Sequence, residues 1–418
     1  MDLVTILAII KEYIWLPLPF VLFWGFWESW IYYINNKYSA GLNWVILEIN
    51  IPEQIEVTPK AMEQVMAGLH GIYKSQNLIE KYIQGIVPRF LSLEIVGING
   101  EIHFLIRTEA QFRNLVEGQV YAQYPDAEIH ETEDYSKLLP KIIPSKDWNL
   151  WGTEMILTKE NYYPIRTYPS FKEEETEEGI IDPLASLTEI MSRLRQGEEL
   201  WLQILISPIT EQWHQDALNL VNKLIGKPVE KKKSFFEVSV LVQEAVAWFE
   251  AVLSALFEFT FAGAAKEDKK PDWPSIMQHL SPGEKARVEA IENKCAKIGF
   301  NSKIRFIYLA RRDVFAMGNV AAFMGSFKQF NIQDLNSFRP DPKTKSSIDY
   351  LFKNRRSTHR RRKILTKYRW RSMSGYKMIL NIEELASIYH FPGIYVKAPR
   401  MPRVEAKKSG PPIGLPIG

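Results

Sequence analysis

Residues 90–108 read FLSLEIVGINGEIHFLIRT, two apolar stretches separated by Asn99-Gly100. An Asn-Gly pair between apolar strands is the strongest short signal for a β-hairpin, because both residues accept the positive φ angles that the tight turn needs. The sequence therefore predicts two antiparallel neighbouring strands over 90–98 and 101–108.

The segments on either side of this hairpin complete a β-α-β-β-α-β order. Thr58-Pro59 marks a helix start, because Thr suits the N-cap and Pro the first helical position. The order is that of a ferredoxin-like sandwich, so we expect a domain over 44–135. Its predicted elements are a strand at 44–51, a helix at 59–74, the hairpin, a helix at 110–124 and a strand at 126–132.

A second, expanded copy of this order is expected over 150–392, with MILN (378–381) as its closing strand. A helical insert, 210–300, separates its two central strands. The fold class is therefore α+β, with two ferredoxin-like units after an N-terminal anchor. The other predicted elements of the second copy are strands at 151–157, 199–207 and 303–310, and helices at 182–196 and 313–330.

The middle of the insert, 235–265, is apolar except for four glutamates on one side of a helix. Carboxylates make a transmembrane helix costly. An amphipathic helix lying on a membrane or a partner is one interpretation, and a long helix packed on its own domain is the other. The four residues are Glu237, Glu244, Glu250 and Glu258.

Residues 1–36 have the composition of a membrane anchor. Positions 13–27 read YIWLPLPFVLFWGFW, fifteen residues without a charge, and four of the 12 Trp lie in the first 33 residues. Trp15, Trp24, Trp27 and Trp30 suit a bilayer interface, where amphipathic rings concentrate. About 20 residues cross a bilayer, so a single crossing by 16–34 is expected, or an interfacial position for 1–12. A buried hairpin of the core is the alternative.

Residues 353–371, KNRRSTHRRRKILTKYRWR, form the sharpest charge feature: ten of nineteen are Lys or Arg and none is acidic. Three interpretations remain open: binding to nucleic-acid phosphates, binding to anionic lipid headgroups, and a solvated loop. The candidate binding residues are the basic side chains and two aromatic ones that could stack on bases. They are Lys353, Arg355, Arg356, Arg360, Arg361, Arg362, Lys363, Lys367, Arg369, Arg371, Tyr368 and Trp370.

The tail, 393–418, is rich in Pro, Gly and Lys and is expected to be extended. Pro fixes φ and removes a backbone donor, so the tail suits a groove on another chain better than a helix or a central strand. The candidate partner-binding residues are Lys407, Lys408, Pro411, Pro412 and Pro416.

Composition and motifs exclude the common catalytic classes. The chain has 418 residues, a net charge of +3 and a single cysteine, Cys295, so an internal disulfide cannot form. A phosphate-binding loop of the G-x-x-x-x-G-K-[ST] type is absent, and so are G-x-S-x-G, H-E-x-x-H and C-x-x-C. The seven His are not paired at metal-ligand spacing. We therefore expect no enzyme activity, cofactor or metal; a hydrolase with an unfamiliar site is the remaining catalytic alternative.

Several segments together carry a resemblance, among them LEINIPEQIEVTPKAMEQVMAGLHG (47–71), RFIYLARRDVF (305–315) and VEAKKSGPPIGLPIG (404–418). The chain resembles the N-terminal, membrane-proximal region of bacterial proteins related to type IV secretion and conjugation. In those relatives the Pro-rich linker leads into a translocase ATPase, and this sequence departs from them because it stops there. The ATPase residues of the family have no counterpart here.

The resemblance implies a membrane-anchored scaffold or accessory subunit of a conjugative transfer system, on the cytoplasmic side of the inner membrane. Its expected partners are a separate translocase ATPase encoded nearby, inner-membrane lipids, DNA and a second copy of the chain. The alternative from another class is a membrane-surface protein that binds nucleic acid through 353–371.

Overall fold

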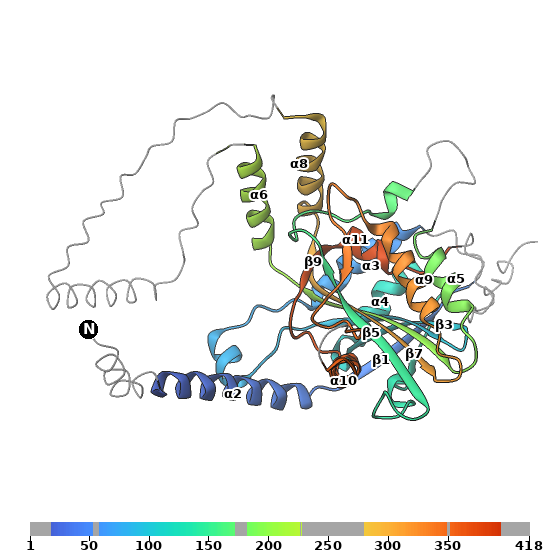
Figure 1. Cartoon of the computed structure of the whole chain (residues 1–418). Helices are drawn as coiled ribbons and strands as arrows, with labels where there is room; N and C mark the ends of the chain where they lie inside the picture. The colour runs from blue at the N-terminus through green and yellow to red at the C-terminus, as the bar shows by residue number, and fades with distance from the viewer. Residues whose placement is uncertain are drawn as a thin grey trace, which may run out of the picture. The chain divides into compact units, whose positions relative to one another are not determined.

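The computed structural model describes residues 18–52, 58–171, 182–225, 227, 280–348 and 352–393. These residues fall into two compact units, one within 1–213 and 293–418 and the other within 214–292. The larger unit holds a nine-stranded antiparallel sheet with helices on both faces, an α+β fold (Figure 1).

The first half of the sheet follows the predicted β-α-β-β-α-β order. Its strands lie in the order β4-β1-β3-β2, and β2 and β3 are joined by the predicted turn, in which Asn99 and Gly100 have φ angles of 54° and 95°. The hairpin prediction is therefore confirmed. The elements are β1 (Trp44–Asn50), α3 (Pro59–Leu69), β2 (Leu91–Ile98), β3 (Glu101–Glu109), α4 (Arg113–Gln123) and β4 (Glu128–Thr132).

The second half repeats the order, with strands β6-β7-β5-β8 across the sheet. The predicted closing strand, 378–381, is wrong: this segment is β9 (Met378–Asn381), which pairs with β7. The strand beside β5 is instead the three-residue β8 (Phe338–Pro340). The remaining elements are β5 (Trp148–Leu157), α5 (Ala185–Ser192), β6 (Glu198–Pro208), β7 (Gly299–Arg311) and α9 (Met317–Phe327).

The two halves meet where β2 pairs antiparallel with β6. The predicted domains 44–135 and 150–392 therefore share one continuous sheet. Every residue of β6 is buried, and so are the first seven of β2, which means that the strands at this seam are covered on both faces. Glu94 of β2 lies opposite Gln203 of β6, at the middle of the seam.

Helices cover the two faces unequally. One face packs with α3, α4, α5, α9 and α11 (Ile382–Ile388) around a large apolar core that includes Ile95, Leu202 and Phe306. The opposite face carries a smaller core with Val96, Trp201 and α10 (Lys353–Arg369). Figure 1 shows α10 nearly end-on and apart from the larger group of helices.

Short helical turns connect these elements. They are η1 (His70–Ile72), the π-helix η2 (Glu80–Gln84), η3 (Ala110–Phe112), η4 (Tyr135–Lys137), η5 (Tyr168–Phe171) and η7 (Lys328–Phe330).

The described part of the predicted insert consists of α6 (Gln212–Leu224) and α8 (Pro282–Cys295). Most of both helices belongs to the smaller unit. The apolar stretch at 235–265 and its four glutamates lie outside the described residues.

The N-terminal helix α2 (Leu18–Ala40) covers most of the predicted anchor. Among the described residues, no helix combines the length and apolar content that crossing a bilayer requires. The predicted crossing by 16–34 is therefore not supported. Trp15 and the interfacial segment 1–12 lie outside the described residues, and Trp24, Trp27 and Trp30 are exposed on α2.

Candidate nucleic-acid interface

The basic segment forms α10, although its own sequence opposes a helix. Like charges recur four residues apart, as at Arg356 and Arg360, and such pairs cost a few tenths of a kcal/mol each. Lys353, Arg355 and Arg356 also lie in the first turn, where the helix dipole favours anions. Contacts with the rest of the fold must therefore hold this helix in place.

The inward side of α10 supplies part of that stabilisation. Ser357, Ile364, Leu365 and Tyr368 are buried. Tyr368 packs against Trp201 of β6, with ring centroids 5.2 Å apart, and its hydroxyl shares a 2.6 Å hydrogen bond with that of Tyr135. Tyr368 is therefore a core residue, unable to stack on a base as the sequence had suggested.

Arg371, just after α10, is 1% exposed and makes two ion pairs. Its guanidinium donates to both carboxylate oxygens of Glu94 at 3.0 and 3.2 Å, and to those of Asp134 at 2.5 and 3.0 Å. Burial alone would raise the pKa of Glu94, but the charge and hydrogen bonds of Arg371 hold that pKa below its ordinary value. Arg371 therefore fixes the end of α10 to the sheet.

A row of buried polar side chains, which we call the seam network, continues from Glu94 across four adjacent strands, β2, β6, β7 and β5. Glu94, Gln203, Arg305 and Glu154 lie directly opposite one another in register. Gln203 donates to Glu94 at 3.0 Å and accepts from Arg305 at 3.0 Å, and Arg305 donates to Glu154 at 3.0 Å. Each charge in the row therefore has a partner, as burial requires.

Glu154 ends the seam network with two more cations. The ammonium groups of Lys303, on β7, and Lys367, on α10, each lie 3.2 Å from a carboxylate oxygen of Glu154. Burial alone would raise the pKa of Glu154, but the positive charges of Arg305 and the two lysines outweigh it, so the pKa is below its ordinary value. Burial lowers the pKa of Lys303 to about 8, in spite of Glu154. Lys367 therefore ties the last turn of α10 to the sheet.

Three other arginines of the segment bind backbone or side-chain oxygens. Arg369 donates to the carbonyls of Ser136, Leu139, Pro140 and Lys141. Arg361 donates to Asn149 Oδ1 at 2.8 Å, and Arg360 donates to two carbonyls at 2.8 and 3.0 Å. With Lys367 and Arg371, these residues attach α10 to the fold, which corrects the interpretation of the whole segment as one binding surface.

The remaining residues face outward. From Arg355 to Trp370 the exposed residues recur at helical spacing and leave the inward side to Ser357, Ile364 and Tyr368. An aromatic side chain stands at each end of this outward stripe: Phe352 is 77% exposed and Trp370 is 78% exposed. The outward stripe consists of Phe352, Lys353, Arg355, Arg356, His359, Arg362, Lys363, Thr366 and Trp370.

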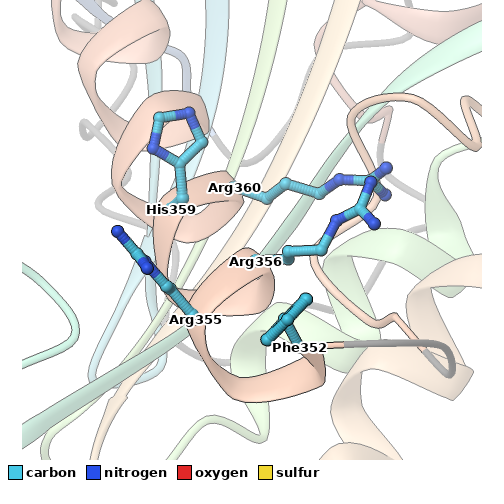
Figure 2. A pocket seen from close by; sticks show the side chains of 5 residues that line it. All are labelled: Phe352, Arg355, Arg356, His359 and Arg360. Atoms are coloured by element: carbon cyan, nitrogen blue, oxygen red, sulfur yellow. The ribbon is translucent and has the colours of Figure 1, made fainter.

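A hollow of about 430 Å³ lies at the start of the outward stripe. Figure 2 shows Arg355 and His359 on one side of the helix, Arg356 and Arg360 on the other, and Phe352 below them. Guanidinium groups bind phosphates through paired N–H donors, so the exposed Arg355 beside this hollow suits a phosphate-bearing ligand.

A family model for a domain of unknown function (DUF8128) matches residues 42–402. The chain belongs to this family. No curated protein matches the chain. The matched region of this DUF8128 protein includes the seam network and α10, whereas α2 precedes it.

The predicted partner-binding residues of the tail lie beyond the DUF8128 match and outside the described residues. They are Lys407, Lys408, Pro411, Pro412 and Pro416.

The structure also groups two histidines that the sequence of this DUF8128 protein separates. His103 Nδ1 and His130 Nε2 lie 2.6 and 3.2 Å from the two carboxylate oxygens of Glu48. The hydrogen bond from His103 is the main reason that the pKa of Glu48 is lowered. Among the described residues, no group of three or more His, Cys, Asp or Glu side chains could hold a metal ion.

Proposed function

We propose that this protein is a non-catalytic binding protein that holds nucleic acid along the outward stripe of α10 at a membrane surface. The observation that carries the proposal is the division of α10 into an attached inward side and an outward basic side. A solvated charge run does not need to be attached to the sheet. A binding helix must be held rigidly while its cations face a ligand.

The aromatic ends favour a single strand over a duplex. Phe352 and Trp370 stand 18 positions apart, which corresponds to about 27 Å along a helix at 1.5 Å per residue. Unpaired bases can stack on exposed rings, while duplex bases are already stacked. Phosphates between the stacked bases would meet Arg355, Arg362 and Lys363.

Fluorescence anisotropy with a labelled single-stranded oligonucleotide tests this proposal. Arg362→Ala/Lys363→Ala should weaken binding about tenfold or more. Lys60→Ala/Lys328→Ala removes two exposed charges from the other face of the sheet and serves as the matched control. Trp370→Ala should weaken single-strand binding by about 1–3 kcal/mol and leave duplex binding unchanged. Equal losses in both double variants, or binding only to anionic vesicles, would overturn it.

We also propose, from the resemblance, that the protein is an accessory or scaffold subunit that recruits a separate translocase ATPase in a type IV secretion-like system. Homo-oligomers and contact with inner-membrane lipids belong to the same proposal. Co-purification of the ATPase encoded nearby, with full-length chain and with a chain lacking 400–418, tests it. Recovery of the ATPase by neither chain would refute recruitment, and equal recovery would remove the tail from the contact.

The two halves of the sheet are proposed to be ferredoxin-like units joined through their second strands. Their matching strand orders support this proposal. The joint between them is the seam that anchors α10, so the same arrangement that joins the units also positions the binding helix.

A further inference from the structure

The first half of α2 is apolar on all sides and exposed on all sides. All ten residues from Val21 to Trp30 are exposed, and Glu28 is the only charged one. A helix that is apolar all round is normally enclosed by a protein core or by lipid. The side of α2 that faces away from Tyr82 therefore needs an apolar cover, which the acyl boundary of a bilayer supplies.

A second apolar element lies beside α2. Leu78, Ile79 and Ile83, in and next to η2, are 73%, 61% and 64% exposed. Three exposed aliphatic side chains within six residues are unusual on a monomer surface and mark an interaction site.

The two elements are joined by specific contacts. Trp30 Nε1 donates to the Tyr82 carbonyl at 3.1 Å, and the rings of Trp27 and Tyr82 are 5.7 Å apart. Gly85, with φ of +68°, approaches so closely that an added Cβ would lie 2.5 Å from the carbonyl carbon of Ile34. Since Tyr82 faces α2, its neighbours Ile79 and Ile83 extend the apolar surface of the helix.

The composition of this surface matches a bilayer interface. Trp24, Trp27, Trp30 and Tyr82 are of the two residue types that concentrate at the headgroup level. Lys81 is exposed and its ammonium lies 4.9 Å from the Tyr82 ring centroid, where it can meet an anionic headgroup.

We infer that α2 and residues 78–83 form one lipid-docking surface, with η2 as a second contact that holds the folded domain against the bilayer. This inference rests on the membrane part of the proposed function and adds a specific site to it. The occupant is a phospholipid bilayer: the aliphatic side chains enter the acyl boundary, and the Trp and Tyr rings lie at the headgroups.

Site-specific labelling of the full-length chain tests the inference. Cys295 is the only cysteine and is buried, so a Cys295→Ala background allows a single new thiol to carry an environment-sensitive fluorophore. The labelled variants are Leu22→Cys on α2, Ile83→Cys on η2, and the control Leu138→Cys, which is equally apolar and exposed but lies elsewhere. The probe is a vesicle of phosphatidylcholine with a fraction of phosphatidylglycerol.

The expected result is a shift of emission to shorter wavelength and a several-fold rise in intensity at positions 22 and 83, with no change at 138. A change at 22 alone would overturn the two-element surface and keep α2 as the membrane contact. No change at 22 or 83 would overturn membrane contact altogether. A change at all three positions would overturn the site by showing unspecific adsorption.

A second measurement uses vesicle sedimentation. Leu78→Asp/Ile83→Asp should lower the partition coefficient about tenfold for each side chain that loses its lipid contact. Leu138→Asp/Ile142→Asp changes two other exposed apolar residues and should leave partitioning unchanged. Equal partitioning of both double variants would contradict the inference.

Discussion

Replacing Arg371 with Ala tests whether the seam network holds the binding helix in place. The substitution removes both ion pairs of Arg371 and takes from Glu94, which is fully buried, its ion-pair partner. Breaking one side of a buried ion pair costs about 3–5 kcal/mol. Ser92, Tyr135 and Gln203 still donate to Glu94, so we expect the lower end, about 3 kcal/mol.

Urea denaturation followed by circular dichroism measures this effect. With a slope of about 3 kcal/mol per molar urea, the midpoint should fall by about 1 M. Arg362→Ala, on the outward stripe of the same helix, should change stability by no more than about 0.5 kcal/mol. Glu94→Gln/Arg371→Met removes both charges, so it should be less destabilised than Arg371→Ala.

Two outcomes would refute this reasoning. If Arg371→Ala and Arg362→Ala have equal midpoints, the ion pairs of Arg371 contribute nothing to the fold. If the double variant is as unstable as the sum of its single variants, Glu94 and Arg371 act independently.

Two further predictions follow from the seam network and the α2 contact. Because the pKa of Lys303 is lowered to about 8, the unfolded chain binds more protons than the folded one above that pH. The stability of the protein relative to its Lys303→Gln variant should therefore rise between pH 8 and about 10 in paired urea titrations; a flat difference would contradict this. Gly85→Ala should release residues 78–86 from α2 and raise their cleavage rate in limited proteolysis severalfold, and an unchanged rate would show that the close approach to Ile34 is not required.

The hairpin and the strand order of the first half could be predicted because their signals are local. Asn99-Gly100 specifies its turn through its own φ preferences, and the apolar stretches beside it specify the strands. The closing strand of the second half could not be predicted in this way. MILN has a stronger strand composition than the three residues of β8. However, β5 pairs with β7 from Ile304 to Arg311, which leaves only the first residues of that edge of β7 open to another strand. β9 therefore pairs with the first residues of β7.

The division of the basic segment also depends on distant residues. Ten cations within 353–371 look alike in sequence, and their helical spacing alone does not say which side is inward. The inward side is set by ion pairs of Arg371 with Glu94 and of Lys367 with Glu154. Both glutamates lie on strands more than 200 positions earlier in the chain. Their only sequence signal is a charged residue in an otherwise apolar strand, which is a weak one.

The salt dependence of single-strand binding tests most directly the central claim that the outward stripe of α10 binds nucleic-acid phosphates. On a single strand, each lost phosphate contact reduces the slope of log affinity against log salt by about 0.7. Arg362→Ala/Lys363→Ala should therefore bind with a slope shallower by about 1.4, measured between about 50 and 200 mM salt, while Lys60→Ala/Lys328→Ala keeps the slope of the unchanged protein. An identical slope in both double variants, or no binding by the unchanged protein at the lowest salt, would contradict the claim.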